Sequence, residues 1–235
     1  EMLHIATLIH DDTVDNSEVR RGRPTVSSQW GRDTAVLLGD YVFATSAIYV
    51  CDTGSIRVIR QFSKAAAELS SGELEEMAAV NNWSETREAY LERIYRKTAS
   101  LFCNVGEAGA VLSGASEDIV QALKSYSRNL GMAFQIVDDI LDIQATSEEL
   151  GKPVGSDLAR GIMTLPAIIA VERHPQNNPF FSLFQDNGDE ESESRAVDLI
   201  QDSSVIKESY EVAEWYGRKA LDCLFWNILI LIQMN

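Results

Sequence analysis

The chain has 235 residues, 45% of them hydrophobic and 24% charged, which is enough to build one large domain or two small ones with a sizeable core. Thirty-six acidic residues against twenty lysines and arginines give a formal net charge of −16 at pH 7, which disfavours a sequence-independent grip on nucleic acid phosphates. Cys51, Cys103 and Cys223 show neither a CxxC pair nor a Cys/His ligand spacing, which argues against a disulfide framework or a zinc site and favours a reducing compartment.

The spacing of apolar residues predicts an all-α protein. Apolar side chains recur at intervals of three and four through most of the chain, and period-two runs rich in Val, Ile and Thr are nearly absent. The longest apolar run, 224–232, contains an asparagine and is too short to span a bilayer, and no signal peptide is expected. We expect one helical bundle, a single domain over 1–235. After a helical pattern at Glu1, the expected helices cover about 33–50, 55–80, 84–111, 117–142, 157–172 and 205–224.

Two serines are expected to cap helices, and one segment is expected to be a loop. Ser84 is a plausible N-cap for the helix over 84–111. Ser116 precedes a helix whose first turn carries two acidic residues, which the helix dipole favours. Segment 173–195 is rich in Pro, Asn and acidic residues, and this composition predicts a long surface connection.

Two acidic motifs of the form DDxxD occur far apart in the chain. On a helix, residues four apart lie on one face, so each motif sets two carboxylates together at a cost of roughly a few tenths of a kcal/mol. A solvated acidic turn is the simplest interpretation of either motif alone. Each motif follows an apolar helical stretch, however, so we expect both to meet at the mouth of a cavity. The motifs are Asp11, Asp12 and Asp15, and Asp138, Asp139 and Asp142.

Magnesium and a diphosphate fit this pattern best. Magnesium binds a few carboxylates and leaves its other positions to water and phosphate oxygens. Transition metals fit less well, because no Glu-x-x-His pair or Cys ligand lies beside either motif. Formally, three doubly charged cations cancel six carboxylates, which leaves the charge of the diphosphate to basic residues such as Arg20 and Arg21. An isolated arginine is more often a partner in a surface salt bridge.

These segments resemble the trans-prenyltransferase family, the isoprenyl diphosphate synthases, of the medium- or long-chain type that makes octaprenyl or solanesyl diphosphate. HDDTVDNSEVRRGRPT resembles the family's first aspartate-rich motif with its arginine pair. GMAFQIVDDILDI, followed by GKPVGSDLARG, resembles the second motif with its downstream lysine. The match runs from Glu1 to about Pro166, and three shorter stretches follow the family's order: Leu38 to Asp40, Gly72 with Glu73, and Lys97 with Thr98.

The resemblance implies the isoprenoid synthase fold, a helical bundle around a deep central cavity, usually in a homodimer. The two aspartate motifs would hold magnesium, three ions with bound diphosphate, and Lys97 would act beside them. Thr98 and Gln135 also have a simpler interpretation, because a polar residue within a helix often bonds only to its neighbours. The positions that match allylic diphosphate ligands are Arg20, Lys97, Thr98, Gln135 and Lys152, and those that match isopentenyl diphosphate ligands are His4 and Arg21.

The implied reaction joins an allylic diphosphate to isopentenyl diphosphate and releases a trans-polyprenyl diphosphate and pyrophosphate. Metal and cationic residues would stabilise the departing pyrophosphate, which then takes the final proton, while an apolar cavity shelters the allylic cation. Thr7 and Ala6 stand four and five residues before Asp11, where short-chain members carry bulky aromatic residues. The small side chains predict a medium or long product, with Leu3 or the facing helices as an alternative floor.

Three departures from the family pattern bear on activity. The family's upstream Gly-Lys-x-x-Arg-Pro segment and its N-terminal helices have no counterpart from Glu1 onward, Ile162 stands where lysine is common, and the end LFWNILILIQMN is unusually apolar. Two alternatives stay open: a non-catalytic subunit of a heteromeric prenyl diphosphate synthase, and a class I terpene cyclase, although a second DDxxD favours chain elongation. The expected compartment is the cytoplasm, a plastid or a mitochondrion. An apolar product would bring peripheral membrane contact.

Overall fold

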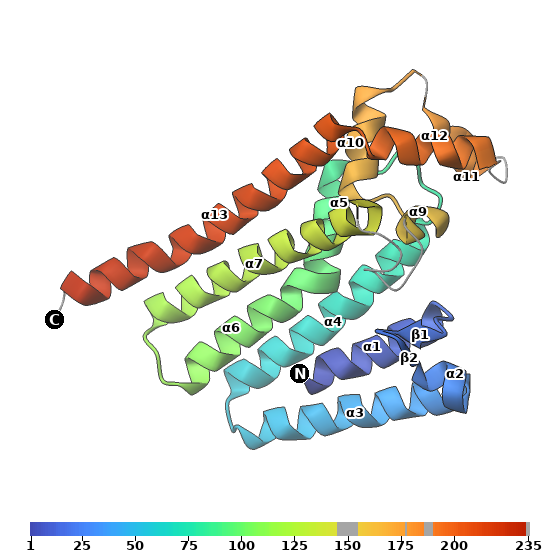
Figure 1. Cartoon of the computed structure of the whole chain (residues 1–235). Coiled ribbons are helices and arrows are strands. Elements are labelled where there is room, and N and C mark those ends of the chain that lie inside the picture. Colours follow the sequence, from blue (N-terminus) through green and yellow to red (C-terminus); the bar gives the residue numbers. More distant parts are fainter. Residues whose placement is uncertain (145–154, 177, 186–189, 234–235) are drawn as a thin grey trace. The chain divides into compact units, whose positions relative to one another are not determined.

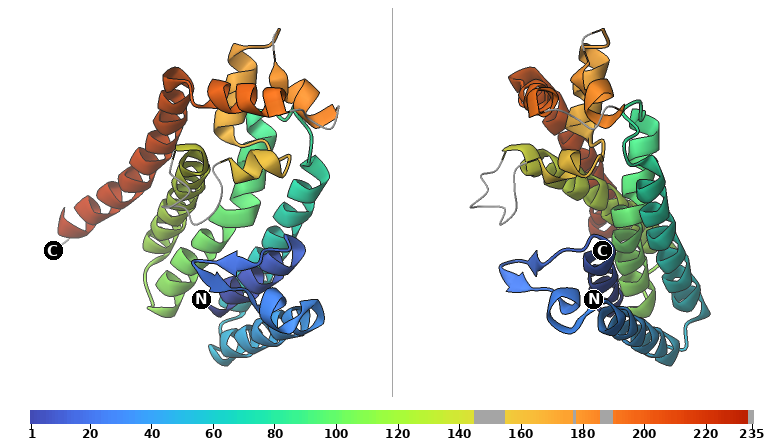
Figure 2. Two further views of the ribbon diagram at one scale, coloured as in Figure 1. Left: turned by 45° about the vertical axis from the view of Figure 1, so that its right-hand side comes forward. Right: turned by 90° about the vertical axis from the view of Figure 1, so that its right-hand side faces the viewer.

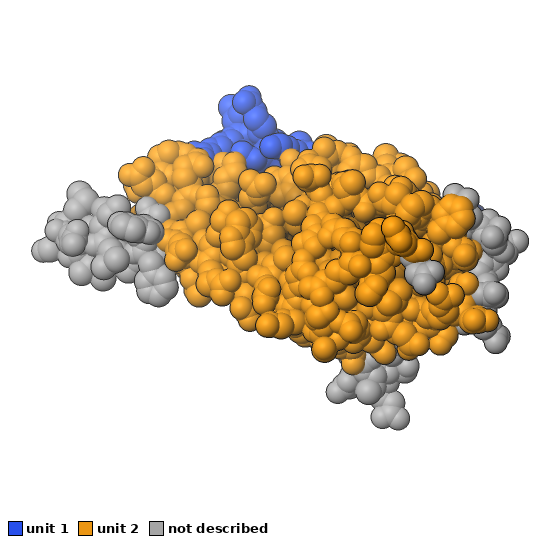
Figure 3. Space-filling view, turned by 90° about the horizontal axis from the view of Figure 1, so that it is seen from above, with its two compact units in different colours: residues 1–66 blue, residues 67–235 orange. Residues whose placement is uncertain are grey.

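The prediction of an all-α protein is confirmed. The computed structural model describes residues 1–144, 155–176, 178–185 and 190–233, and the regular structure in these ranges is helical apart from one two-stranded hairpin. The chain separates into two compact units, residues 1–66 and 67–235, which Figure 3 shows in different colours. The boundary lies within helix α4 (Ile56–Ala79).

The first unit is built on two helices, α1 (Met2–Val14) and α3 (Arg32–Asp52), which pack against each other. A hairpin and a short helix connect them. These are β1 (Val19–Arg20), β2 (Arg23–Pro24) and α2 (Val26–Trp30).

The hairpin places Arg20 and Arg23 side by side within the segment that connects α1 and α3. Arg20 pairs with Arg23 across the two antiparallel strands. Arg21 and Gly22 form the turn with positive φ angles of 52° and 74°, which is the requirement of a type I′ hairpin turn. Thr25 closes the segment, because its hydroxyl donates to Ser17 O (2.6 Å) and caps α2.

The second unit is a helical bundle in which α7 (Glu117–Gln144) lies between α6 (Ser100–Leu112) and α13 (Ser203–Gln233), as Figures 1 and 2 show. Its largest buried side chains include Tyr90, Ile136, Ile168 and Phe180, none more than 2% exposed. Burial of each such side chain contributes about 1.5–3 kcal/mol, so this core holds the polar ends of the helices in place. The other helices are α5 (Arg87–Ile94), the π-helix η1 (Tyr95–Ala99), α9 (Ser156–Ala159), α10 (Leu165–Arg173), α11 (Pro179–Gln185) and α12 (Glu190–Ile200).

The expected helix over 84–111 is a composite of α5, η1 and α6, and its cap differs from the prediction. Thr86, not Ser84, caps α5, because the Thr86 hydroxyl accepts from Ala89 N at 3.2 Å. Ser84 instead donates to Asn82 Oδ1 at 3.0 Å. The five-residue π turn interrupts the α-helical hydrogen bonding at Lys97 and Thr98.

Two further predictions were wrong in detail. The helix expected over 157–172 is two helices, α9 and α10, because Gly161 adopts a positive φ of 76° and its missing side chain leaves room for Asn81. The surface connection expected over 173–195 contains α11 and the start of α12. Phe180 anchors α11, since it is fully buried and its ring packs on Phe184 with centroids 6.5 Å apart.

Candidate active site

The first acidic motif lies at the C-terminal end of α1, where the three carboxylates have different surroundings. Asp12 is only 6% exposed and accepts a hydrogen bond from Arg20 Nε at 2.7 Å. Asp15 ends the helix, with its backbone N–H donating to Asp11 O at 2.8 Å, and the side chains of Asp11 and Asp15 are partly exposed. One arginine of the predicted pair is therefore held beside the motif by an ion pair with the buried carboxylate.

His4 and Arg21, the two positions expected to bind isopentenyl diphosphate, are both exposed in the first unit. Partial burial, with smaller contributions from the positive charges of Arg21 and Arg20, lowers the pKa of His4 below its usual value. His4 is therefore neutral at pH 7, and its ring offers one donor and one acceptor.

A contact between α1 and α3 was missed by the sequence analysis. The Nε2 atom of His10 lies 3.2 Å from Val36 O and 3.4 Å from Asp40 Oδ1. A Cβ atom on Gly39 would lie only 2.2 Å from that nitrogen. Glycine at this position thus makes room for the histidine ring immediately before the first motif. The sequence pattern marked Leu38 to Asp40 only by its position along the chain, and that position does not show that His10 packs against it.

The two positions expected to control product length differ in accessibility. Ala6 is 1% exposed, whereas Thr7 is partly exposed and its hydroxyl donates to His4 O at 2.9 Å. Leu3, the alternative floor residue, is 5% exposed. A role for any of them in product length stays a prediction.

The second acidic motif occupies the last two turns of α7, and its three carboxylates also differ in their exposure to solvent. Asp138 is exposed, Asp139 is 5% exposed and Asp142 is 2% exposed. Burial, with a further contribution from Asp157, raises the pKa of Asp139 to about 7, against the opposing effect of hydrogen bonds from Tyr90 and Gln135. Asp138 is thus the carboxylate of this motif that faces solvent.

A row of hydrogen bonds links Asp139 to two of the predicted substrate ligands. Thr98 Oγ1 donates to Gln135 Oε1 at 2.7 Å, and Gln135 Nε2 donates to Asp139 Oδ1 at 2.8 Å. The other carboxylate oxygen of Asp139 accepts from the hydroxyl of Tyr90 at 2.6 Å. Tyr90 is fully buried on α5, 49 residues away in sequence, and nothing in the sequence pattern pointed to it.

Asp142 has a structural role that the spacing of the motif did not reveal. Its Oδ1 atom accepts from the hydroxyl of Ser156 at 2.7 Å, and its Oδ2 atom lies 3.2 Å from the backbone N–H of Asp157. Its backbone carbonyl accepts from Gly155 N at 2.8 Å. Both carboxylate oxygens therefore hold the first turn of α9, which makes Asp142 less suitable as a metal ligand than Asp138.

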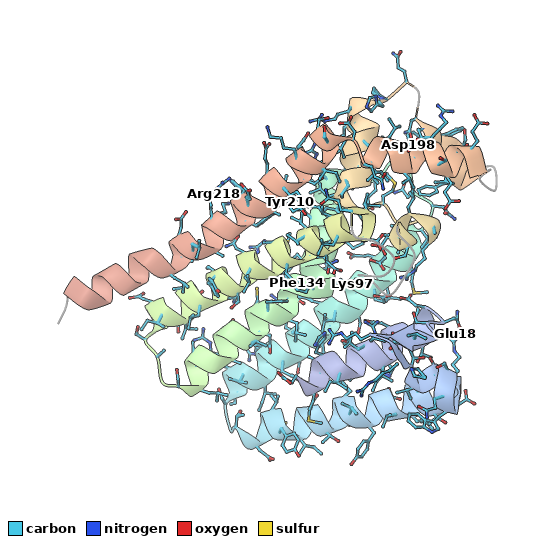
Figure 4. All side chains as sticks on the ribbon, viewed as in Figure 1. Glu18, Lys97, Phe134, Asp198, Tyr210 and Arg218 are labelled. Atoms are coloured by element: carbon cyan, nitrogen blue, oxygen red, sulfur yellow. The ribbon has the colours of Figure 1, made fainter. Side chains whose placement is uncertain are left out.

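Lys97 extends from η1 toward two glutamates of α4, and its position is labelled in Figure 4. Its Nζ atom lies 2.9 Å from Glu73 Oε2 and also bonds to Glu76. Burial lowers the pKa of Lys97, but the ion pairs with Glu76 and Glu73 outweigh it and raise the pKa well above its usual value. Glu76 is shared with the buried Arg93, whose Nη1 atom lies 2.9 Å from Glu76 Oε2. Lys97 is therefore charged and held in one place.

Two positions named from the sequence need separate mention. Lys152 lies outside the described residues. Ile162, where the family often has lysine, is 6% exposed and follows the turn at Gly161. An apolar side chain suits that buried position.

Carboxylate oxygens suit a hard cation such as magnesium, and the exposed members of the motifs fit it best. Within the described residues, no group of three or more His, Cys, Asp or Glu side chains is arranged to hold a metal ion as it stands. Magnesium commonly uses one or two protein carboxylates and completes its shell with water and phosphate. Asp138 in one motif, and Asp11 and Asp15 in the other, present oxygens compatible with that chemistry.

Comparison with known proteins identifies the family. Residues 1–200 match the model of the polyprenyl synthetase family. The chain is 38% identical over 224 residues to solanesyl-diphosphate synthase 2, chloroplastic, of Oryza sativa subsp. japonica, covering 95% of the chain and 55% of the rice protein. It is also 38% identical over 224 residues to heptaprenyl diphosphate synthase component 2 of Bacillus subtilis, covering 95% of the chain and 64% of that protein.

Solved structures agree in fold. The decaprenyl diphosphate synthase from Rhodobacter capsulatus superposes with a TM-score of 0.87 at 37% identity, over 95% of this chain and 70% of that one. A polyprenyl synthase from Caulobacter crescentus, complexed with calcium and isoprenyl diphosphate, gives a TM-score of 0.88 at 34% identity, over 95% and 69%. The chain therefore has the isoprenoid synthase fold and belongs to the polyprenyl synthetase family.

Proposed function

We propose that the chain is the prenyltransferase part of a magnesium-dependent polyprenyl diphosphate synthase. The substrates are an allylic diphosphate and isopentenyl diphosphate, and the products are a trans-polyprenyl diphosphate and pyrophosphate. The observation that carries this proposal is the hydrogen-bonded row from Thr98 through Gln135 to Asp139, which lies beside the exposed Asp138. The family of the chain, and the calcium and isoprenyl diphosphate in the Caulobacter relative, support it further.

In the first step the bond between C1 and oxygen of the allylic diphosphate breaks, and its electron pair leaves with pyrophosphate. Lys97 and Arg20 contribute positive charge toward the departing oxygens, and Thr98 contributes a hydroxyl. Asp138 in the second unit, and Asp11 with Asp15 in the first, would hold magnesium, which would supply further charge neutralisation for that group. The ion pairs of Lys97 with Glu73 and Glu76, and of Arg20 with Asp12, orient these cations before the substrate arrives.

In the second step the double bond of isopentenyl diphosphate attacks the allylic cation, and a proton then leaves C2 to the released pyrophosphate. His4 and Arg21 bind the second diphosphate. The cation needs an apolar, water-poor wall. Phe102 and Phe134 offer an apolar surface one turn from Thr98 and Asp138, with ring centroids 5.6 Å apart, and Phe134, labelled in Figure 4, is 55% exposed.

The product is of medium or long chain length. Ala6 and Thr7 are too small to close a tunnel one turn from Asp11. The names of the relatives, a solanesyl, a heptaprenyl and a decaprenyl diphosphate synthase, point the same way. These relatives include chloroplastic and bacterial proteins, which supports a plastid or the cytoplasm as the compartment of the chain.

The working assembly is a dimer through α3. This helix is long and apolar enough to cross a membrane by length and composition alone, and only 17% of its most apolar stretch is buried. Leu37, Tyr41 and Ile48 lie on one face of it at 69%, 70% and 60% exposure. Such an exposed apolar stripe calls for a partner, and a second copy of the chain is the simplest. A different subunit is the alternative, because the Bacillus relative is named as a component.

Incubation of the purified chain with labelled isopentenyl diphosphate, an allylic primer and magnesium tests the proposal. We expect prenyl diphosphates longer than the primer, their loss on addition of a chelator, and a rate at least about a hundredfold lower for Asp138→Asn. Cyclic hydrocarbons would identify a terpene cyclase instead. A chain that binds both diphosphates but forms product only when a partner subunit is added would be a non-catalytic component.

A further inference from the structure

The π-helix η1 departs from regular α-helical geometry at Lys97 and Thr98, two of the residues that the proposed function uses. π-Helical turns are rare, and they occur mostly as single turns inside α-helices, frequently at functional sites. Here the turn spans Tyr95–Ala99 between α5 and α6, and Lys97 and Thr98 are its third and fourth residues. An i→i+5 turn changes the direction of the side chains that follow it relative to an unbroken α-helix.

Two glycines allow neighbouring helices to approach the backbone of η1 unusually closely. A Cβ atom on Gly72 of α4 would lie 2.7 Å from Lys97 N and 3.0 Å from Lys97 Cα. A Cβ atom on Gly131 of α7 would lie 2.7 Å from Ala99 Cα. Because these neighbours are backbone atoms, no change of rotamer relieves either clash. Both glycines are buried.

The polar partners of Lys97 and Thr98 lie on the same two helices, one turn or less from the glycines. Glu73 and Glu76, which bond to Lys97, follow Gly72 by one and four residues. Gln135, which accepts from Thr98, follows Gly131 by four residues. The close approach at each glycine therefore sets the distance over which these side chains reach η1.

We propose that Gly72 and Gly131 are positioning residues, which hold η1 between α4 and α7 so that Lys97 and Thr98 meet the allylic diphosphate. The inference rests on the proposed function. It adds that the geometry of the diphosphate-binding groups depends on two residues that touch no ligand. An alanine at either position displaces η1 and weakens diphosphate binding beyond any effect on folding.

Gly72→Ala and Gly131→Ala test the proposal, with Gly109→Ala as the matched control, because Gly109 lies in α6 with no atom within 4 Å of its added Cβ. The dissociation constant of inorganic pyrophosphate with magnesium is measured by calorimetry on folded protein. We expect an increase of about tenfold for the two variants and less than about twofold for the control. In the elongation assay, KM for the allylic substrate should rise while KM for isopentenyl diphosphate stays unchanged.

Double mutants separate positioning from a general loss of packing. With Lys97→Ala already present, Gly72→Ala should change the pyrophosphate dissociation constant by less than about twofold, and Gly131→Ala should do the same in Thr98→Ala. Unchanged binding in both single variants, or an equal loss in Gly109→Ala, would overturn the proposal. A wild-type chain that binds no pyrophosphate would refute the proposed function instead.

Amide hydrogen exchange of the wild-type chain replaces binding data for any variant that fails to fold. Magnesium pyrophosphate should slow exchange at residues 95–99 by about tenfold and leave residues 109–112 unaffected, because only the first segment carries the proposed ligands. Equal exchange at residues 95–99 with and without pyrophosphate, in a chain that binds pyrophosphate, would overturn the proposal.

Discussion

Tyr90 donates a buried hydrogen bond to Asp139 from another helix. Tyr90→Phe removes the hydrogen bond to Asp139 Oδ2 and leaves that buried oxygen without this donor. An unsatisfied buried polar group costs about 1–3 kcal/mol, so we expect a loss of this size in the free energy of unfolding, measured in urea without metal.

Tyr49→Phe is the matched control, because Tyr49 is 61% exposed and should change stability by less than about 0.5 kcal/mol. A Tyr90→Phe variant as stable as wild type would show that the hydroxyl does not support Asp139.

The ion pairs of Glu76 predict the direction in which the stability of the second unit changes with pH. Burial raises the pKa of Glu76, but the ion pairs with Lys97 and Arg93 outweigh it, so the net pKa is below the usual value of 4.5. A depressed pKa in the folded state contributes stability that is present above the unfolded pKa and is lost as pH falls through the folded pKa. Glu76→Gln should therefore cost about 3 kcal/mol at pH 7.

The difference between wild type and Glu76→Gln should shrink in urea titrations as pH falls below about 4.5, because the wild-type carboxylate becomes protonated. Glu214→Gln is the control, since Glu214 is 65% exposed in its pair with Arg218 and contributes little at any pH. A difference that is constant from pH 7 to below pH 4 would contradict the ion-pair account.

For single residues, the sequence identified the aspartates of the two motifs but not the side chains that surround them. The DDxxD spacing marked six carboxylates alike, whereas the structure exposes Asp138 and buries Asp139 and Asp142. The difference arises from Tyr90 and Ser156, which approach from other helices. Spacing along one helix reports which residues share a face, and burial depends on what packs against that face.

At the scale of helices and strands, the exposed stripe on α3 carries the proposal of a dimer. Leu37→Glu with Ile48→Glu places two charges on this face, and desolvating them in an apolar interface is costly. We expect the double variant to sediment as a monomer under conditions in which wild type sediments as a dimer. Leu221→Glu on α13, where Leu221 is 53% exposed, should leave the sedimentation coefficient unchanged. A wild-type chain that is monomeric at all concentrations would refute the proposal.

Long helices were predictable and short interruptions were not. The helices α3, α4 and α7 carry apolar residues over several turns, so the local pattern was sufficient to locate them. The helix α13 was also located, but it continues to Gln233, beyond the expected end at 224. The π turn at Lys97 lies in close contact with Gly72 and Gly131 of other helices, which the local pattern of apolar residues does not report. The helix α11 was missed because Pro and Asn around it suggested a loop, although Phe180 buries it in the core.

For the whole molecule, product length is the property that the first unit should control. Thr7→Phe introduces an aromatic ring at a partly exposed position one turn before Asp11 and should shorten the longest product. Ala6→Phe should also shorten it, but at a cost of about 1–3 kcal/mol in stability, because Ala6 is 1% exposed. Chromatographic sizing of the labelled products, with thermal melts of both variants, makes the comparison. Unchanged product lengths in both variants would place the floor of the tunnel elsewhere.

The central claim is that Lys97 and Asp138 of the second unit bind one magnesium diphosphate. The most direct test is a double-mutant cycle in which Lys97→Ala and Asp138→Asn are combined and the dissociation constant of magnesium pyrophosphate is measured by calorimetry. Groups that share one ligand have non-additive effects, so each single variant should weaken binding about a hundredfold and the double variant little more. Strictly additive losses, or binding unaffected by either substitution, would contradict the claim.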